Sequence, residues 1–79
     1  MPTVLQSNGF DVMIYTHDHQ PRHVHVWRGE AEVIINIESL DIWEVNRYAT
    51  SRIVRQAWHL VAANQEYLLS EWERIRPIP

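Results

Sequence analysis

The chain has 79 residues, seven basic and ten acidic side chains, a formal net charge of −3 and no cysteine. This length predicts a single domain over residues 1–79. The lack of cysteine excludes disulfides and zinc–thiolate sites, and the acidic balance argues against a mainly electrostatic nucleic-acid binder. No apolar run approaches the roughly 20 residues that span a bilayer, and the N-terminus lacks the pattern of a signal peptide. We therefore expect a cytoplasmic protein without membrane contact.

The first half of the chain carries the signals of short strands. Clusters of turn-forming residues separate the apolar runs, and such short connections favour an antiparallel meander. The segment Leu40–Val45 is ambiguous between an edge strand and a turn of helix. Strands are predicted over Thr3–Leu5, Phe10–Thr16, His23–Trp27 and Ala31–Ile37.

From Thr50 the apolar residues recur at helical spacing, and Thr50 or Ser51 can cap the start of the helix. One long helix is favoured over two, with a break at Ala63-Asn64-Gln65 as the alternative. These patterns predict an α+β fold, in which a small antiparallel sheet of three to four strands is followed by one long C-terminal helix packed on one face. The helix stripe is wide, so its uncovered part is a candidate surface for a dimer or a partner.

Four of the five histidines lie in the segment His17–His25. Because side chains alternate along a strand, His23 and His25 face one way, while Val24 and Val26 face the core. A site forms only if the preceding loop folds back over the histidine face. Three functions are open for such a site.

The first function is metal binding. Two histidines separated by one residue lie roughly 6.5 Å apart at Cα on a strand and can offer two imidazole nitrogens to one ion. Residues of the adjacent loop, Asp18 included, can complete the ligand set. The expected ligands of a divalent metal are His17, His19, His23 and His25, and no other cofactor is expected.

The second function is acid–base catalysis, and it leaves open whether the protein is an enzyme. His23 and His25 can move a proton on and off a reacting oxygen, while Arg22 or Arg28 holds a phosphate. This set suits a small metal-independent ribonuclease, in which the RNA 2′-hydroxyl is the nucleophile.

The third function is recognition of a partner protein by a loop that side-chain hydrogen bonds hold in place. It needs no catalytic motif. The expected binding residues are Asp18, His19, Pro21, Trp27 and Arg28.

The chain resembles a family of short bacterial proteins, domain-of-unknown-function family 4160 (DUF4160). The resemblance covers nearly the whole chain, and its most specific part is the Asp18–Val26 core. It implies a component of a toxin–antitoxin pair that acts through protein–protein contact, because members are often encoded beside a second small domain. The partner is then that neighbour, or a second copy of the chain. Shared features are Met1-Pro2-Thr3-Val4, Gly9-Phe10, Ile14-Tyr15, Asp18-His19-x-Pro21-x-His23-Val24-His25-Val26, Gly29-Glu30, Leu60-Val61, Leu68-Leu69 and Trp72.

Overall fold

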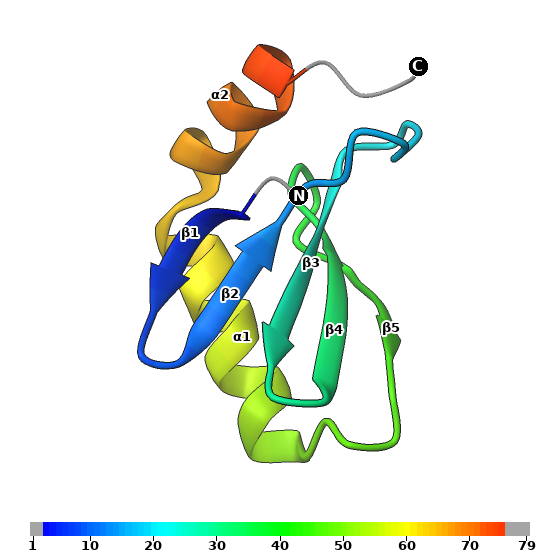
Figure 1. The fold of residues 1–79 in the computed structure, drawn as a ribbon, viewed down its shortest axis with the longest axis vertical. Coiled ribbons are helices and arrows are strands. Elements are labelled where there is room, and N and C mark those ends of the chain that lie inside the picture. The colour runs from blue at the N-terminus through cyan, green and yellow to red at the C-terminus, as the bar shows by residue number, and fades with distance from the viewer. Residues whose placement is uncertain (1–2, 76–79) are drawn as a thin grey trace.

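The computed structural model describes residues 3–75, in which five strands precede two helices (Figure 1). The strands form one antiparallel sheet in the order β1-β2-β3-β4-β5, so the α+β class and the meander are confirmed. The sheet has five strands, where three to four were predicted, and the additional strand is the edge strand β5. The Met1-Pro2 part of the family resemblance lies outside the described residues. The strands are β1 (Thr3–Ser7), β2 (Phe10–Met13), β3 (His23–Arg28), β4 (Ala31–Asn36) and β5 (Ile42–Val45).

The turn between β1 and β2 follows from its two residues. Asn8 and Gly9 have φ angles of 51° and 83°, and the flanking Ser7 and Phe10 are paired. Two consecutive positive φ angles match the right-handed twist of the flanking strands, which is why Asn-Gly is favoured in such hairpins. β1 therefore continues to Ser7, two residues beyond the predicted Leu5.

β2 ends at Met13, three residues before the predicted Thr16. The reason is a local turn that uses the main-chain groups of Tyr15. The Tyr15 N–H donates to Asp18 Oδ2 at 2.9 Å, and the Asp18 N–H donates to the Tyr15 carbonyl at 3.0 Å. These groups are no longer available to a sheet ladder.

The ambiguous segment after β4 contains the edge strand β5. Asn36 ends β4 one residue before the predicted Ile37, because its side-chain oxygen accepts hydrogen bonds from the N–H groups of Glu38 and Ser39. Leu40, with a φ of 65°, completes the turn. The chain then returns beside β4.

The prediction of one long helix is wrong, and its alternative is confirmed. The helices are α1 (Ser51–Ala63) and α2 (Gln65–Ile75), with Asn64 between them. The Asn64 main-chain N–H donates to the Val61 carbonyl, and its side-chain amide donates to the Leu60 carbonyl. Asparagine competes in this way with the regular helix ladder. The helix start is as predicted, because Thr50 Oγ1 accepts from the Ile53 N–H at 3.2 Å.

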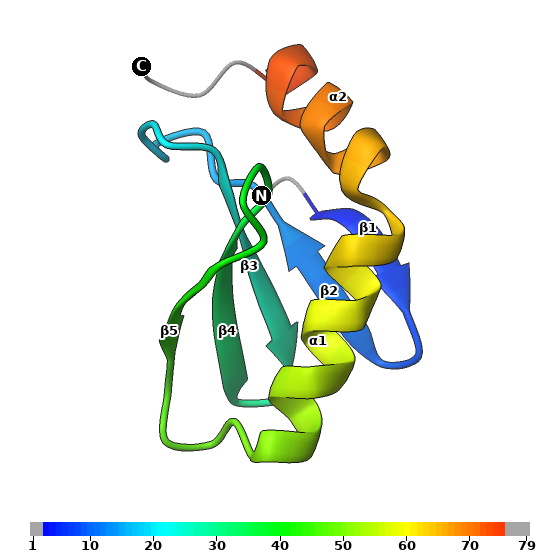
Figure 2. The same ribbon diagram turned by 180° about the vertical axis from the view of Figure 1, so that it is seen from behind.

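α1 lies across one face of the sheet, and α2 continues from it beyond the end of β1, as the two opposite views show (Figures 1 and 2). The core lies between the two layers, and the other face of the sheet carries polar and aromatic side chains. Among residues 3–75, no helix is long and apolar enough to cross a membrane. The helices contribute Ala57, Val61, Leu68 and Trp72 to the core. The strands contribute Val4, Phe10, Val12, Val24, Val26, Val33 and Ile35, and Ile14 and Ile37, which directly follow β2 and β4, complete it.

Candidate functional site

The site begins with the alternation of side chains along β3. Val24 and Val26 are buried against the helices, as the sequence predicts. His23 and His25 therefore point to the opposite, open face of the sheet, and the centroids of their rings lie 5.2 Å apart.

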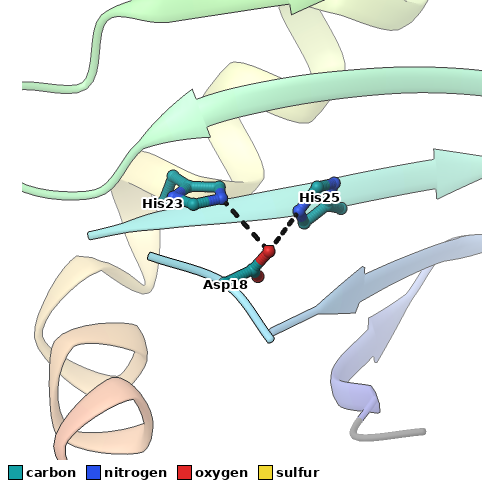
Figure 3. A group of neighbouring side chains, drawn as sticks. All are labelled: Asp18, His23 and His25. Atoms are coloured by element: carbon teal, nitrogen blue, oxygen red, sulfur yellow. Dashed lines mark hydrogen bonds and ion pairs between the residues drawn. The ribbon is translucent and has the colours of Figure 1, made fainter. Parts of the chain in front are cut away.

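The loop before β3 folds back over this face and brings in Asp18 (Figure 3). Asp18 Oδ1 lies 3.4 Å from His23 Nε2 and 3.2 Å from His25 Nε2. Its other oxygen accepts the Tyr15 N–H, so the turn that ends β2 also orients this carboxylate. The three side chains are only 11–13% exposed, although they lie on the face that the helices leave uncovered.

The second nitrogen of each imidazole faces an oxygen that accepts hydrogen bonds. His23 Nδ1 lies 2.8 Å from the Pro21 carbonyl, and His25 Nδ1 lies 3.0 Å from Glu32 Oε2. A carbonyl and a carboxylate can only accept, so each Nδ1 donates to its neighbour when it carries the ring proton. In that tautomer of the neutral ring, Nε2 is unprotonated and can bind a cation. Both Nε2 atoms face Asp18 Oδ1, which accepts a hydrogen bond from a protonated Nε2 or shares a cation with unprotonated ones.

Two imidazole nitrogens and a carboxylate oxygen that converge in this way are also atoms that a metal ion can bind together. Ligand atoms about 2.0–2.2 Å from a metal ion lie about 2.8–3.6 Å apart at octahedral or tetrahedral angles. The two nitrogen–oxygen distances, 3.4 and 3.2 Å, fall in this range. Asp18, His23 and His25 each offer one ligand atom, and all three atoms lie within 4.8 Å of one another.

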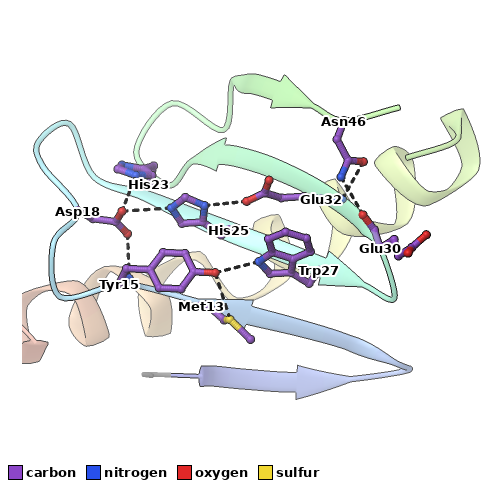
Figure 4. Close-up of polar contacts among 9 residues, drawn as sticks. All are labelled: Met13, Tyr15, Asp18, His23, His25, Trp27, Glu30, Glu32 and Asn46. Carbon is purple, nitrogen blue, oxygen red and sulfur yellow. Dashed lines mark hydrogen bonds and ion pairs between the residues drawn. The ribbon is translucent and has the colours of Figure 1, made fainter. Parts of the chain in front are cut away.

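A wider set of contacts fixes the cluster (Figure 4). Asn46, at the end of β5, accepts the Glu32 N–H and donates to the Glu30 carbonyl, which ties β4 to the edge of the sheet. On the other side, the Trp27 indole donates to the Tyr15 hydroxyl at 3.0 Å. The Tyr15 ring then stands against the His25 ring, with their centroids 4.5 Å apart.

Aromatic side chains enclose His23. The Trp43 ring of β5 lies 5.1 Å from it between centroids, and the Trp72 ring of α2 lies 5.6 Å from it. The break at Asn64 gives α2 its own direction, and α2 reaches the base of the site loop. The edge strand β5 and the second helix α2 thus form the walls of the site. The sequence left the first of these elements ambiguous and gave the second only as an alternative.

The structure brings together some of the predicted site residues and separates others. His23 and His25 are in the cluster, and Asp18 stands where the sequence favoured His17 and His19. Both of these histidines are exposed in the loop, outside the group of converging ligand atoms. Sequence reasoning missed Glu32, whose partner is set by strand pairing. Its only signal was the alternation of β4, which places Glu32 on the open face once β3 and β4 form a hairpin.

The two arginines predicted to hold a phosphate point elsewhere. Arg22 Nη2 lies 3.0 Å from a Glu73 carboxylate oxygen, toward α2. Arg28 lies over the Phe10 ring and donates to Gln56, on the helix side of the sheet. A metal-independent ribonuclease stays a prediction, and it requires a phosphate ligand other than these two guanidinium groups in their present positions.

The fold and the cluster define a small α+β domain with a histidine–carboxylate group on its open sheet face. The family model "Domain of unknown function (DUF4160)" matches residues 9–73, and the chain belongs to this family. The matched range contains Asp18, His23, His25 and Glu32. No curated protein and no solved structure shows a significant match to the chain.

Proposed function

We propose that this protein is a metal-binding domain in which Asp18, His23 and His25 bind one divalent transition-metal ion. The observation that carries the proposal is the convergence of three atoms that can bind a metal, His23 Nε2, His25 Nε2 and Asp18 Oδ1. The two nitrogen–oxygen separations are 3.4 and 3.2 Å, and all three atoms lie within 4.8 Å of one another. Imidazole ligands favour Zn²⁺, Fe²⁺, Ni²⁺ or Cu²⁺ over Mg²⁺ or Ca²⁺.

The surroundings of the cluster support the same function. Ligating histidines almost always donate their other ring N–H to a carboxylate or a carbonyl, which fixes the tautomer and raises the basicity of the ligand. Glu32 and the Pro21 carbonyl occupy these two positions. A set of two histidines and one carboxylate leaves coordination positions open for water or a ligand. This composition is that of a reactive metal centre, because structural zinc sites are closed by four protein ligands.

Metal content and affinity test the proposal. We expect untagged protein to bind about one Zn²⁺ ion per chain by titration calorimetry and by elemental analysis after dialysis. His23→Ala, His25→Ala and Asp18→Asn should each abolish stoichiometric binding. His17→Ala should retain it, which separates the Asp18 cluster from the four-histidine set expected from the sequence.

Two results would overturn the metal proposal. One is substoichiometric metal in correctly folded wild-type protein, with folding checked by circular dichroism. The other is unchanged binding in the three cluster variants. His59→Ala, which removes an exposed histidine of α1, is the matched control for the loss of one imidazole.

A second candidate function is protein–protein contact, and the family resemblance suggests a toxin–antitoxin pair as its setting. The observation that favours it is a group of exposed apolar side chains at one edge of the sheet, Ile42, Trp43, Val45 and Tyr48. Aromatic residues are enriched in the centres of interfaces. Co-expression with the product of the adjacent gene tests this candidate, and separate elution of the two proteins at micromolar concentration would contradict it.

A further inference from the structure

The edge strand β5 is exposed in a way that differs from the rest of the sheet. All four of its residues are exposed, and Ile42, Trp43 and Val45 keep 43–46% of their surface in contact with solvent. Beside the strand, an open hollow of about 590 Å³ separates β5 from α1. Its apolar walls are formed by Ile42, Val45, Ala49, Val54 and Trp58.

An irregularity in β5 arranges this surface. Ile42 and Val45 pair with Ile35 and Val33 of β4, which are buried under the helices. Residues that are directly paired share a face, so Ile42 and Val45 both lie on the helix side, although three positions separate them. The extra residue is Trp43, because the register shifts by one residue between Ile34 and Ile35 of β4.

The same irregularity turns unpaired main-chain groups outward. The Asp41 carbonyl accepts from Asn36, and the Asn46 N–H donates to Glu32, so both point toward β4. Main-chain groups alternate along a strand, so those of the neighbouring Ile42 and Val45 point away from β4. Their N–H and C=O groups form an open sheet edge that can pair with another strand.

We infer that β5 is the contact between two copies of this chain, which pair antiparallel across a two-fold axis between Trp43 and Glu44. In this register, Ile42 of each copy lies opposite Val45 of the other. The two residues exchange their outward main-chain hydrogen bonds, and the sheet becomes continuous through both copies. Ile42 and Val45 of the two copies then meet on the helix side of the sheet. Each copy thereby adds apolar surface to the hollow of the other copy.

The strand's own sequence favours a second copy as the occupant. An interface across a two-fold axis must be self-complementary. In the proposed register, Trp43 faces Glu44, Asp41 faces Asn46, and Leu40 faces Arg47 of the second copy, so no like charges are directly opposed. A chain of 79 residues is also small enough to gain stability from burial between subunits.

The inference is independent of metal binding, but it bears on the site. Trp43 lies on β5 and its ring stands 5.1 Å from that of His23, so pairing at β5 places a second copy beside the cluster. It uses the same surface as the protein-contact candidate and commits that surface to one occupant.

The molar mass of the metal-free protein in solution tests the inference. We expect light scattering or sedimentation equilibrium to give twice the 9.4 kDa of the chain. Val45→Lys should shift the protein to the monomer, because a lysine at a sheet edge opposes pairing. Thr3→Lys, which places the same charge on the exposed first residue of β1 at the other edge, should leave the dimer intact.

A spin label provides a second measurement, since the chain has no cysteine of its own. A label on Glu44→Cys should show strong dipolar coupling between copies, and a label on Thr3→Cys should show none. A monomer at all concentrations would overturn the inference, as would a dimer that is insensitive to Val45→Lys with uncoupled labels at position 44. A monomer that co-elutes with the neighbouring gene product would overturn self-pairing and support the second candidate function instead.

Discussion

Glu32 has a distinct position among the residues of the site, because it acts on the proposed ion only through His25. Its carboxylate holds His25 Nδ1 at 3.0 Å, and Asn46 holds the main chain of Glu32 in turn. A carboxylate in this position increases the electron density on the opposite nitrogen and fixes the ring. Glu32 is therefore a positioning residue, separate from the three ligands.

Replacing Glu32 with glutamine should weaken metal binding without abolishing it. The amide oxygen can still accept from His25 Nδ1, but the negative charge is lost. Removal of such an outer partner typically reduces affinity by about 10–100-fold. Titration calorimetry with Zn²⁺ checks the change, with Glu30→Gln, an exposed neighbour, as the control. Equal affinities of Glu32→Gln and the wild type would show that Glu32 has no influence on the ion.

At the scale of elements, hydrogen bonds of single side chains set three boundaries of helices and strands. Thr50 caps α1, Asn64 separates the helices, and Asn36 ends β4. The cap was predictable because threonine before a helical pattern has a local mechanism. The break at Ala63-Asn64-Gln65 was only the alternative prediction, because the apolar period continues through Asn64 and favours an uninterrupted helix. Gln65 contributes as well, since its side-chain amide donates to the Ile37 carbonyl, a contact between residues far apart in sequence.

Removing the α1 cap should lower stability. Thr50→Ala leaves the Ile53 N–H without its side-chain acceptor, and the free energy of unfolding should fall by about 1 kcal/mol. Urea denaturation followed by tryptophan fluorescence gives the difference. Ser51→Ala, one residue into the helix, is the matched loss of a hydroxyl and should change stability less. A larger loss in Ser51→Ala would mean that the cap is assigned to the wrong residue.

The ion pair of α2 gives a pH-dependent contribution. Two hydrogen bonds from the Arg74 guanidinium lower the pKa of Glu71 below its ordinary value. A folded-state pKa below the unfolded one stabilises the protein above the unfolded pKa, and this contribution is lost as the pH falls through the folded pKa. Arg74→Ala should therefore be slightly less stable than the wild type at neutral pH and equally stable in strong acid. Because Arg74 is exposed, salt should reduce the neutral-pH difference. If Arg74→Ala remained less stable than the wild type in strong acid, the loss of stability would come from packing and not from the ion pair.

At the scale of the whole molecule, features that depend on neighbouring residues could be predicted, and features that depend on residues distant in the sequence could not. Strand alternation is local, and it places His23 and His25 on the open face and the valines in the core. The position of Asp18 depends on how the loop folds, and the pairing of Glu32 with His25 depends on strand register. The register in turn follows from the whole hairpin of β3 and β4. The contact between Trp72 and His23 likewise joins residues that lie far apart in the sequence.

Metal binding should stabilise the entire fold, because the ligands belong to two separate segments. Asp18 lies in the loop and the two histidines lie on the central strand β3, so unfolding separates them. At a free Zn²⁺ concentration of about 100 times the dissociation constant, binding to the native state alone adds about 2.7 kcal/mol. For a domain of this size the midpoint of thermal unfolding should rise by roughly 10–20 °C.

Differential scanning calorimetry with and without chelator measures this shift. His25→Ala should lose it, and His59→Ala should keep it, because His59 lies on α1 away from the open face of the sheet. Each variant is compared with its own metal-free form, which separates the contribution of the ion from any change in packing. A shift of equal size in His25→Ala would place the stabilising ion outside the cluster.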